Sequence, residues 1–219
     1  MKSAVLAASI LLVASAAALA DVNSLFLNGL AFFDTGDLEK TSRDVHAGNL
    51  SPAFDGDFLL SFRDKKKTSV LAGFGILWSR RTEKDDEIPF EAPERMARVE
   101  ALGFPFALGF ARKEAAMDRR GLSWGALAQY YFVKFTVDAD PARGDPAGFS
   151  LDASGRGERD GEGPALSAFA IYDFPFFLGR AGVGVKARWA GVAIQKEPGL
   201  STPEVDLTGV TLFASIALR

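Results

Sequence analysis

The sequence contains no cysteine and only one histidine, His46. The absence of cysteine excludes a disulfide framework, a thiolate metal site and an N-terminal cysteine that carries a lipid. With a single histidine, the chain also has few candidates for a general base at neutral pH. The fold must therefore be stabilised by packing and hydrogen bonding, without covalent cross-links.

The N-terminus has the order of a secretory signal peptide. Lys2 precedes an apolar stretch at 4–18, and Ala18-Leu19-Ala20 supplies the small residues of a cleavage site before Asp21. The apolar stretch is short for a transmembrane anchor. We therefore expect residues 1–20 to be removed on export and residues 21–219 to form one mature domain.

Basic residues and long apolar runs are scarce in the mature chain. Without Lys2, the 25 basic residues become 24 against 28 acidic ones, a balance of minus 4. No basic patch suited to a phosphate backbone is present, so nucleic acid is not an expected partner. After Ala20 no apolar run reaches the ~18 residues of a membrane helix, so a mature chain that crosses a membrane must cross it as a β-barrel.

Charged residues are also absent from several stretches of about ten residues, which are rich in Gly, Val, Phe and Ala. These stretches are Val22–Phe33, Ser69–Ser79, Gly121–Val133, Pro164–Tyr172 and Leu207–Leu218. Turn residues bound them, and they lack the polar face that a helix would show, so they are typical of strands. The sequence predicts about eight strands, at 23–33, 57–63, 69–80, 96–104, 121–135, 164–173, 181–193 and 205–218.

The segments between these strands alternate in character along the chain. Long polar segments are expected at 34–56, 81–95, 136–163 and 194–204, and the other gaps fall at 64–68, 105–120 and 174–180. This alternation predicts an antiparallel up-and-down barrel in which both termini lie at the end of the barrel that carries the short turns. Within the second turn, residues 107–120 fit either a short amphipathic helix or a strand extension. Phe104-Pro105-Phe106 and Phe174-Pro175-Phe176 are each expected to end a strand, because proline interrupts the ladder.

Alternation of side chains is clearest near residue 186. Val183, Val185, Ala187 and Trp189 share one face, and Gly184, Lys186, Arg188 and Ala190 share the other. A soluble lipocalin-like barrel would need many more charges on its water-facing strands. We therefore predict an all-β, membrane-spanning barrel whose narrow lumen is largely filled by side chains.

Two groups of residues are candidates for special roles in such a barrel. The first is a lumen charge cluster, in which Glu100 is expected to face inward and lie close to Lys186 or Arg188; its members are Arg98, Glu100, Lys186 and Arg188. It would act as a selectivity or gating cluster, or as an ion-pair network that satisfies buried charge. The second is an aromatic girdle at the membrane interfaces, formed by Trp78, Phe104, Phe106, Trp124, Tyr130, Tyr172, Phe174, Phe176 and Trp189.

The signal peptide, the charge-poor strands and the long acidic segments together resemble the small eight-stranded outer-membrane barrels of the OmpA, OmpX and OmpW kind. This resemblance implies a location in the outer membrane of a Gram-negative-type bacterium after cleavage between Ala20 and Asp21. It also implies membrane lipid as a neighbour, insertion by the barrel assembly machinery, and a monomer without a cofactor. Chains of this type usually end in an aromatic residue, whereas this one ends in Ile216-Ala217-Leu218-Arg219.

Three functions are compatible with such a barrel. The favoured one is a structural or surface-interaction role with a closed lumen, and the alternative is a narrow channel for small solutes. A lipid-modifying enzyme would depend on His46 alone, and no enzyme is predicted. An acidic segment also lacks the ligand spacing of a calcium loop and is expected to be solvated; its members are Asp138, Asp140, Asp145, Asp152, Glu158, Asp160 and Glu162. No metal site is predicted.

Overall fold

The computed structural model describes residues 22–33, 50–63, 67–83, 97–113, 120–140, 145–146, 148–177, 179–200, 202 and 204–218. The expected signal peptide, its cleavage site and His46 lie outside these residues. All regular secondary structure in the described part is β-strand. None of its segments is a helix long and apolar enough to cross a membrane.

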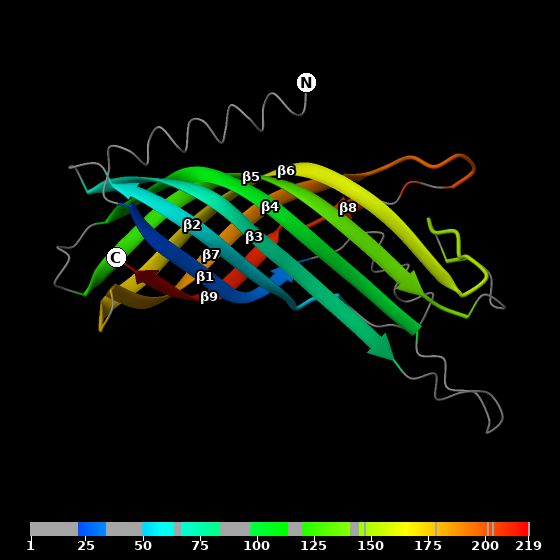
Figure 1. Ribbon diagram of the computed structural model, residues 1–219, viewed down its shortest axis with the longest axis horizontal. Coiled ribbons are helices and arrows are strands. Elements are labelled where there is room, and N and C mark those ends of the chain that lie inside the picture. Colours follow the sequence, from blue (N-terminus) through cyan, green and yellow to red (C-terminus); the bar gives the residue numbers. More distant parts are fainter. Residues whose placement is uncertain are drawn as a thin grey trace.

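The strands form one closed antiparallel sheet (Figure 1). They are β1 (Val22–Phe33), β2 (Ala53–Arg63), β3 (Thr68–Glu83), β4 (Ala97–Lys113), β5 (Gly121–Asp138), β6 (Arg156–Phe176), β7 (Gly179–Ile194), β8 (Glu204–Asp206) and β9 (Gly209–Leu218). Strands β1 to β7 each pair with the next, and β9 pairs with both β7 and β1, which closes the ring.

Strands β8 and β9 are two parts of one strand. Val192 of β7 lies opposite Val205, and Arg188 lies opposite Gly209, so both parts pair with β7 in the same register. The ladder is interrupted between Asp206 and Gly209, where the Thr208 hydroxyl accepts a hydrogen bond from the backbone N–H of Ala190 (3.1 Å). The fold is therefore the eight-stranded antiparallel barrel that the sequence predicts.

The strands are strongly staggered. The stagger can be measured by moving from each residue to its partner on the next strand, once around the barrel. From Val22 this circuit passes through Phe62, Val70, Phe110, Ala126, Ala168, Ala187 and Val210. The circuit returns to β1 at Phe32, a shift of ten residues from Val22. Such a stagger requires the strands to tilt, typically by about 35–45° from the barrel axis, and Figure 1 shows this inclination.

The prediction that Phe104-Pro105-Phe106 ends a strand is wrong, because β4 continues through this motif to Lys113. Pro105 pairs with Tyr131 of β5. On the other side of β4, the pairing with β3 is interrupted between Gly103 and Phe106, so Pro105 has no partner on β3. Proline is tolerated here because only one of the two ladders is interrupted. The described residues after the motif are therefore a strand extension, one of the two structures that the sequence left open.

Two other strands begin earlier than predicted. Strand β2 starts at Ala53, which adds Asp55 to the sheet. Strand β6 starts at Arg156 and not near 164, so three acidic residues for which the sequence predicts a loop lie on a strand; they are Glu158, Asp160 and Glu162. Phe174-Pro175-Phe176 does end β6, as predicted.

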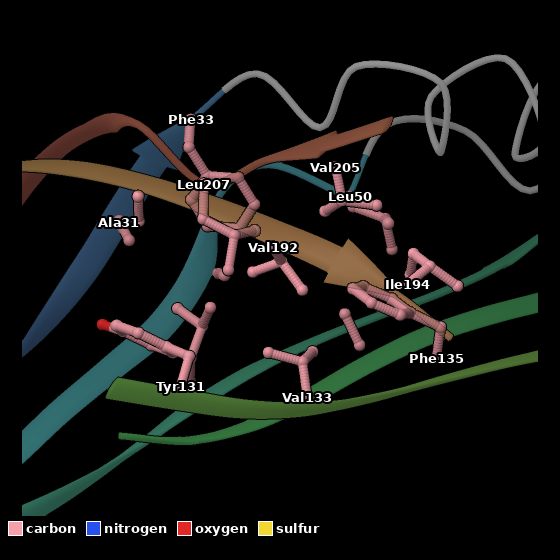
Figure 2. Packing of buried hydrophobic residues seen from close by; sticks show 14 of the residues in the cluster. Ala31, Phe33, Leu50, Tyr131, Val133, Phe135, Val192, Ile194, Val205 and Leu207 are labelled. Atoms are coloured by element: carbon pink, nitrogen blue, oxygen red, sulfur yellow. The ribbon is translucent and has the colours of Figure 1, made fainter. Parts of the chain in front are cut away.

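The interior is filled by two apolar clusters. The larger one lies toward the end with the long connections, and Figure 2 shows its side chains from β1, β5, β7 and the last strand directed toward one another. The smaller one lies toward the end with the termini and includes Leu27, Leu59, Leu127 and Phe169. Between the two clusters lies a layer of polar and charged side chains.

Candidate functional site

The polar layer is built from charged residues on two strands that are not neighbours. Asp55 and Asp57 are two apart on β2, and Lys186 and Arg188 are two apart on β7, so each pair shares one face of its strand. All four side chains are buried, with at most 2% of each residue exposed. Because β2 and β7 do not pair, the two groups meet across the interior of the barrel.

The charges of this layer are balanced. Lys186 Nζ lies 2.8 Å from Asp55 Oδ2 and 2.7 Å from Asp57 Oδ2. Arg188 Nη1 lies 3.2 Å from Asp55 Oδ2. Two cations therefore face two carboxylates. Such pairing is required, because a buried charge without a partner costs several kcal/mol.

Neutral side chains extend the network around the two carboxylates. The Thr211 hydroxyl donates to Asp55 Oδ2 (2.6 Å), and the Gln129 amide donates to Asp57 Oδ1 (3.2 Å). The Ser167 hydroxyl in turn donates to Gln129 Oε1 (2.6 Å). Buried polar networks of this kind are stable when their members are paired, so this layer fixes the positions of several strands at once.

The Arg188 guanidinium occupies the space next to the carboxylates. It donates to the Tyr131 hydroxyl oxygen (3.0 Å) and to the carbonyl of Leu207 (2.9 Å). Its central carbon lies 5.6 Å from the ring centres of both Phe33 and Tyr131, which is a favourable distance for cation–π attraction. A large buried side chain therefore packs between the carboxylates and the aromatic rings inside the barrel.

Of the four residues predicted for the lumen cluster, the structure brings together only two inside the barrel. Lys186 and Arg188 face inward, but Arg98 and Glu100 lie on the outer face of β4, where Glu100 accepts hydrogen bonds from Arg98 and from the Trp78 indole (2.9 Å). The expected proximity of Glu100 to Lys186 or Arg188 is wrong. This end of β4 turns its apolar residues inward, such as Val99, so the charges face outward.

The sequence interpretation missed the true partners, Asp55 and Asp57. It placed residues 34–56 in a loop and so removed Asp55 from the barrel. The signal was present, because Phe54-Asp55-Gly56-Asp57-Phe58 alternates with a period of two and puts both carboxylates on one face.

The outer face of the barrel is apolar over a broad zone. All nine residues predicted to form the aromatic girdle face outward, with exposed fractions from 37% for Trp124 to 58% for Trp189. The outward positions from Leu122 to Phe132 on β5, and from Pro164 to Phe176 on β6, carry no charge. We call the exposed outward-facing apolar side chains of the long strands the apolar belt.

Beyond the apolar belt, toward the long connections, the outer face becomes charged. Lys134 Nζ lies 2.5 Å from Glu158 Oε2, and Arg156 Nη2 lies 2.5 Å from Glu158 Oε1. Hydrogen bonds from Lys134 and Arg156 lower the pKa of the Glu158 carboxyl, so this pairing persists at neutral pH. The change from apolar to charged side chains along one strand marks a sharp edge of the belt.

The fold and its interior define the chain as a closed eight-stranded antiparallel β-barrel with a charge-balanced layer in its core. No known protein family and no curated protein matches the sequence. Among the residues that the structure describes, no group of three or more acidic, histidine or cysteine side chains is placed to hold a metal ion.

Proposed function

We propose that this protein is an outer-membrane β-barrel with a structural or surface-interaction role and a closed lumen. The apolar belt is the observation that carries this proposal. It exposes large apolar side chains on all the long strands, among them Leu166, which is 64% exposed. Continuous apolar surface of this extent is rare on soluble monomers and is typical of membrane or protein contacts.

The height of the apolar belt supports lipid as its partner. On β5 the belt extends over the eleven residues from Leu122 to Phe132, which are ten steps apart along the strand. At ~3.3 Å per residue and a tilt of about 40°, this length spans about 25 Å along the barrel axis. Outer-membrane barrels carry an apolar band of about 25 Å.

The interior supports a closed lumen. Phe149, from the connection between β5 and β6, is completely buried in the larger apolar cluster together with Leu50. Arg159 donates to the carbonyl of Gly148 (2.7 Å) and so holds this connection against the barrel. The long connections and the charged strand ends then belong outside the cell, where they are available for surface contacts.

Leu166→Arg is expected to destabilise the barrel by about 2–4 kcal/mol in lipid vesicles, because Leu166 would face the hydrocarbon interior. Equilibrium unfolding in urea measures the change. Thr82→Arg is a matched control, because Thr82 is exposed on β3 beyond the belt, and its expected effect is within about 0.5 kcal/mol. Equal effects of the two substitutions would contradict a lipid-facing belt.

The closed lumen predicts that the purified barrel adds no ion conductance to a planar lipid bilayer. Apolar clusters lie on both sides of the charged layer in the described interior, and apolar packing of this kind opposes the passage of ions. Single-channel recording of the mature protein tests this expectation. Discrete conductance steps that require the folded protein would favour the narrow-channel alternative instead.

A further inference from the structure

The end of the barrel that holds the termini of the described chain contains a cavity of about 150 Å³. Four of the inward-facing residues around it are serines, on β2, β3, β5 and β9; they are Ser61, Ser69, Ser123 and Ser215. Inward-facing positions further into the barrel on these strands and their neighbours carry larger side chains of the smaller apolar cluster, such as Leu59, Leu71 and Leu127. The cavity therefore arises from small side chains on four strands. At ~30 Å³ for each water, it has room for about five waters or a small organic molecule.

The inner part of the cavity is apolar. Leu25, Leu71, Phe169 and Ile171 line it, and three of these side chains belong to the smaller apolar cluster. These residues offer an apolar surface that a hydrocarbon group of a ligand could cover, and covering it would remove apolar area from water.

The wall and the mouth of the cavity are polar. Asp173 is paired with Arg180 and accepts a hydrogen bond from the Ser123 hydroxyl (2.5 Å). Lys67 and Lys113 lie together at the mouth, because the backbone N–H of Lys113 donates to the carbonyl of Lys67 (3.1 Å). Arg112 also contributes to the lining, so four cationic side chains and one carboxylate line the described cavity.

We propose that this cavity is a binding site for a small organic anion with a short apolar tail. The anionic head would lie at the mouth near Lys67 and Lys113, and the tail would cover the apolar lining. The hydroxyls of Ser61, Ser69 and Ser215 would donate hydrogen bonds to the oxygens of the head, whereas the Ser123 hydroxyl already donates to Asp173. A bare inorganic anion would leave the apolar lining uncovered, and a neutral alcohol would gain nothing from the cations. The proposal concerns the interior of the barrel and does not depend on whether the apolar belt contacts lipid.

Calorimetric titration of the mature barrel, refolded in detergent micelles, tests the site with three probes. Hexanoate is expected to bind saturably, at one molecule per barrel, with a millimolar dissociation constant. Hexanol and inorganic phosphate are expected to bind at least about tenfold more weakly, because each lacks one of the two contacts. Empty micelles give the background heat. A hexanoate signal equal to this background, or hexanol binding as tightly as hexanoate, would overturn the proposal.

Two substitutions locate the binding. Lys113→Gln is expected to weaken hexanoate binding about three- to tenfold. Lys134→Gln removes the same charge from the outer face at the opposite end and is expected to leave binding unchanged. Ser215→Leu is expected to fill the cavity and abolish binding. If Ser215→Leu does not fold, the two lysine variants still test the site. Equal affinities of Lys113→Gln and Lys134→Gln for hexanoate would refute it.

Discussion

Lys186→Met is expected to destabilise the folded barrel by about 3–5 kcal/mol. The substitution keeps a side chain of similar size but removes the ammonium that lies 2.8 Å from Asp55 and 2.7 Å from Asp57. Arg188 still pairs with Asp55, but Asp57, which is buried, loses its contact with Lys186. Equilibrium unfolding in urea, followed by tryptophan fluorescence, measures the loss.

Two further variants show whether the effect comes from the buried network. Glu100→Ala removes a charge that is paired on the outer face of β4, and its expected cost is at most about 1 kcal/mol. Adding Asp57→Asn to Lys186→Met removes the carboxylate left without its cation and should restore part of the lost stability. A Lys186→Met variant as stable as Glu100→Ala would show that the charged layer does not stabilise the barrel.

Gly29→Ala is expected to destabilise the barrel by about 3 kcal/mol or to prevent its closure. Gly29 lies opposite Phe213 in the ladder that joins β1 to β9 and closes the ring. A Cβ atom at this position would lie 1.9 Å from the Leu212 carbonyl oxygen and 2.6 Å from Phe213 Cα. Both contacts are with backbone atoms, which can move away only if the closing ladder opens.

Gly191→Ala is the matched control for this substitution. Gly191 also lies in a strand, but a Cβ atom built there would have no heavy atom within 4 Å. Its expected effect on the free energy of unfolding is within about 0.5 kcal/mol. The yield of folded barrel and its urea midpoint compare the two variants directly. Similar values for both would mean that the closing strands approach less closely than the structure describes.

Much of the barrel was predictable because strand composition is a local property. Each of the five uncharged stretches of about ten residues coincides with part of a strand, and the alternation around Lys186 places Lys186 and Arg188 on one face. Boundaries were less predictable where a local signal was ambiguous. Pro105 resembled a strand end, but one interrupted ladder is tolerated within β4. Glu158 has acidic neighbours that are typical of a loop. It nevertheless lies on β6, because charge on a strand is allowed beyond the apolar belt.

The candidate site was predictable only in part for a different reason. A period of two shows which residues share a face, but it does not show which face is turned inward. The prediction that Arg98 and Glu100 lie in the lumen depends on the assumption that charges within the membrane-spanning part of a barrel face inward. The charged end of β4 lies beyond the belt, so this assumption did not apply there.

The sequence by itself determined an all-β chain with about eight strands, several of them poor in charged residues. It could do so because strand length, composition and alternation depend on residues that are neighbours in the chain. Only the tertiary structure decided that Lys186 meets Asp57, which is 129 residues away along the chain. That contact depends on the number of strands and on the ten-residue stagger at which β9 closes onto β1. Both are properties of the closed ring, so no single segment of the sequence could specify them.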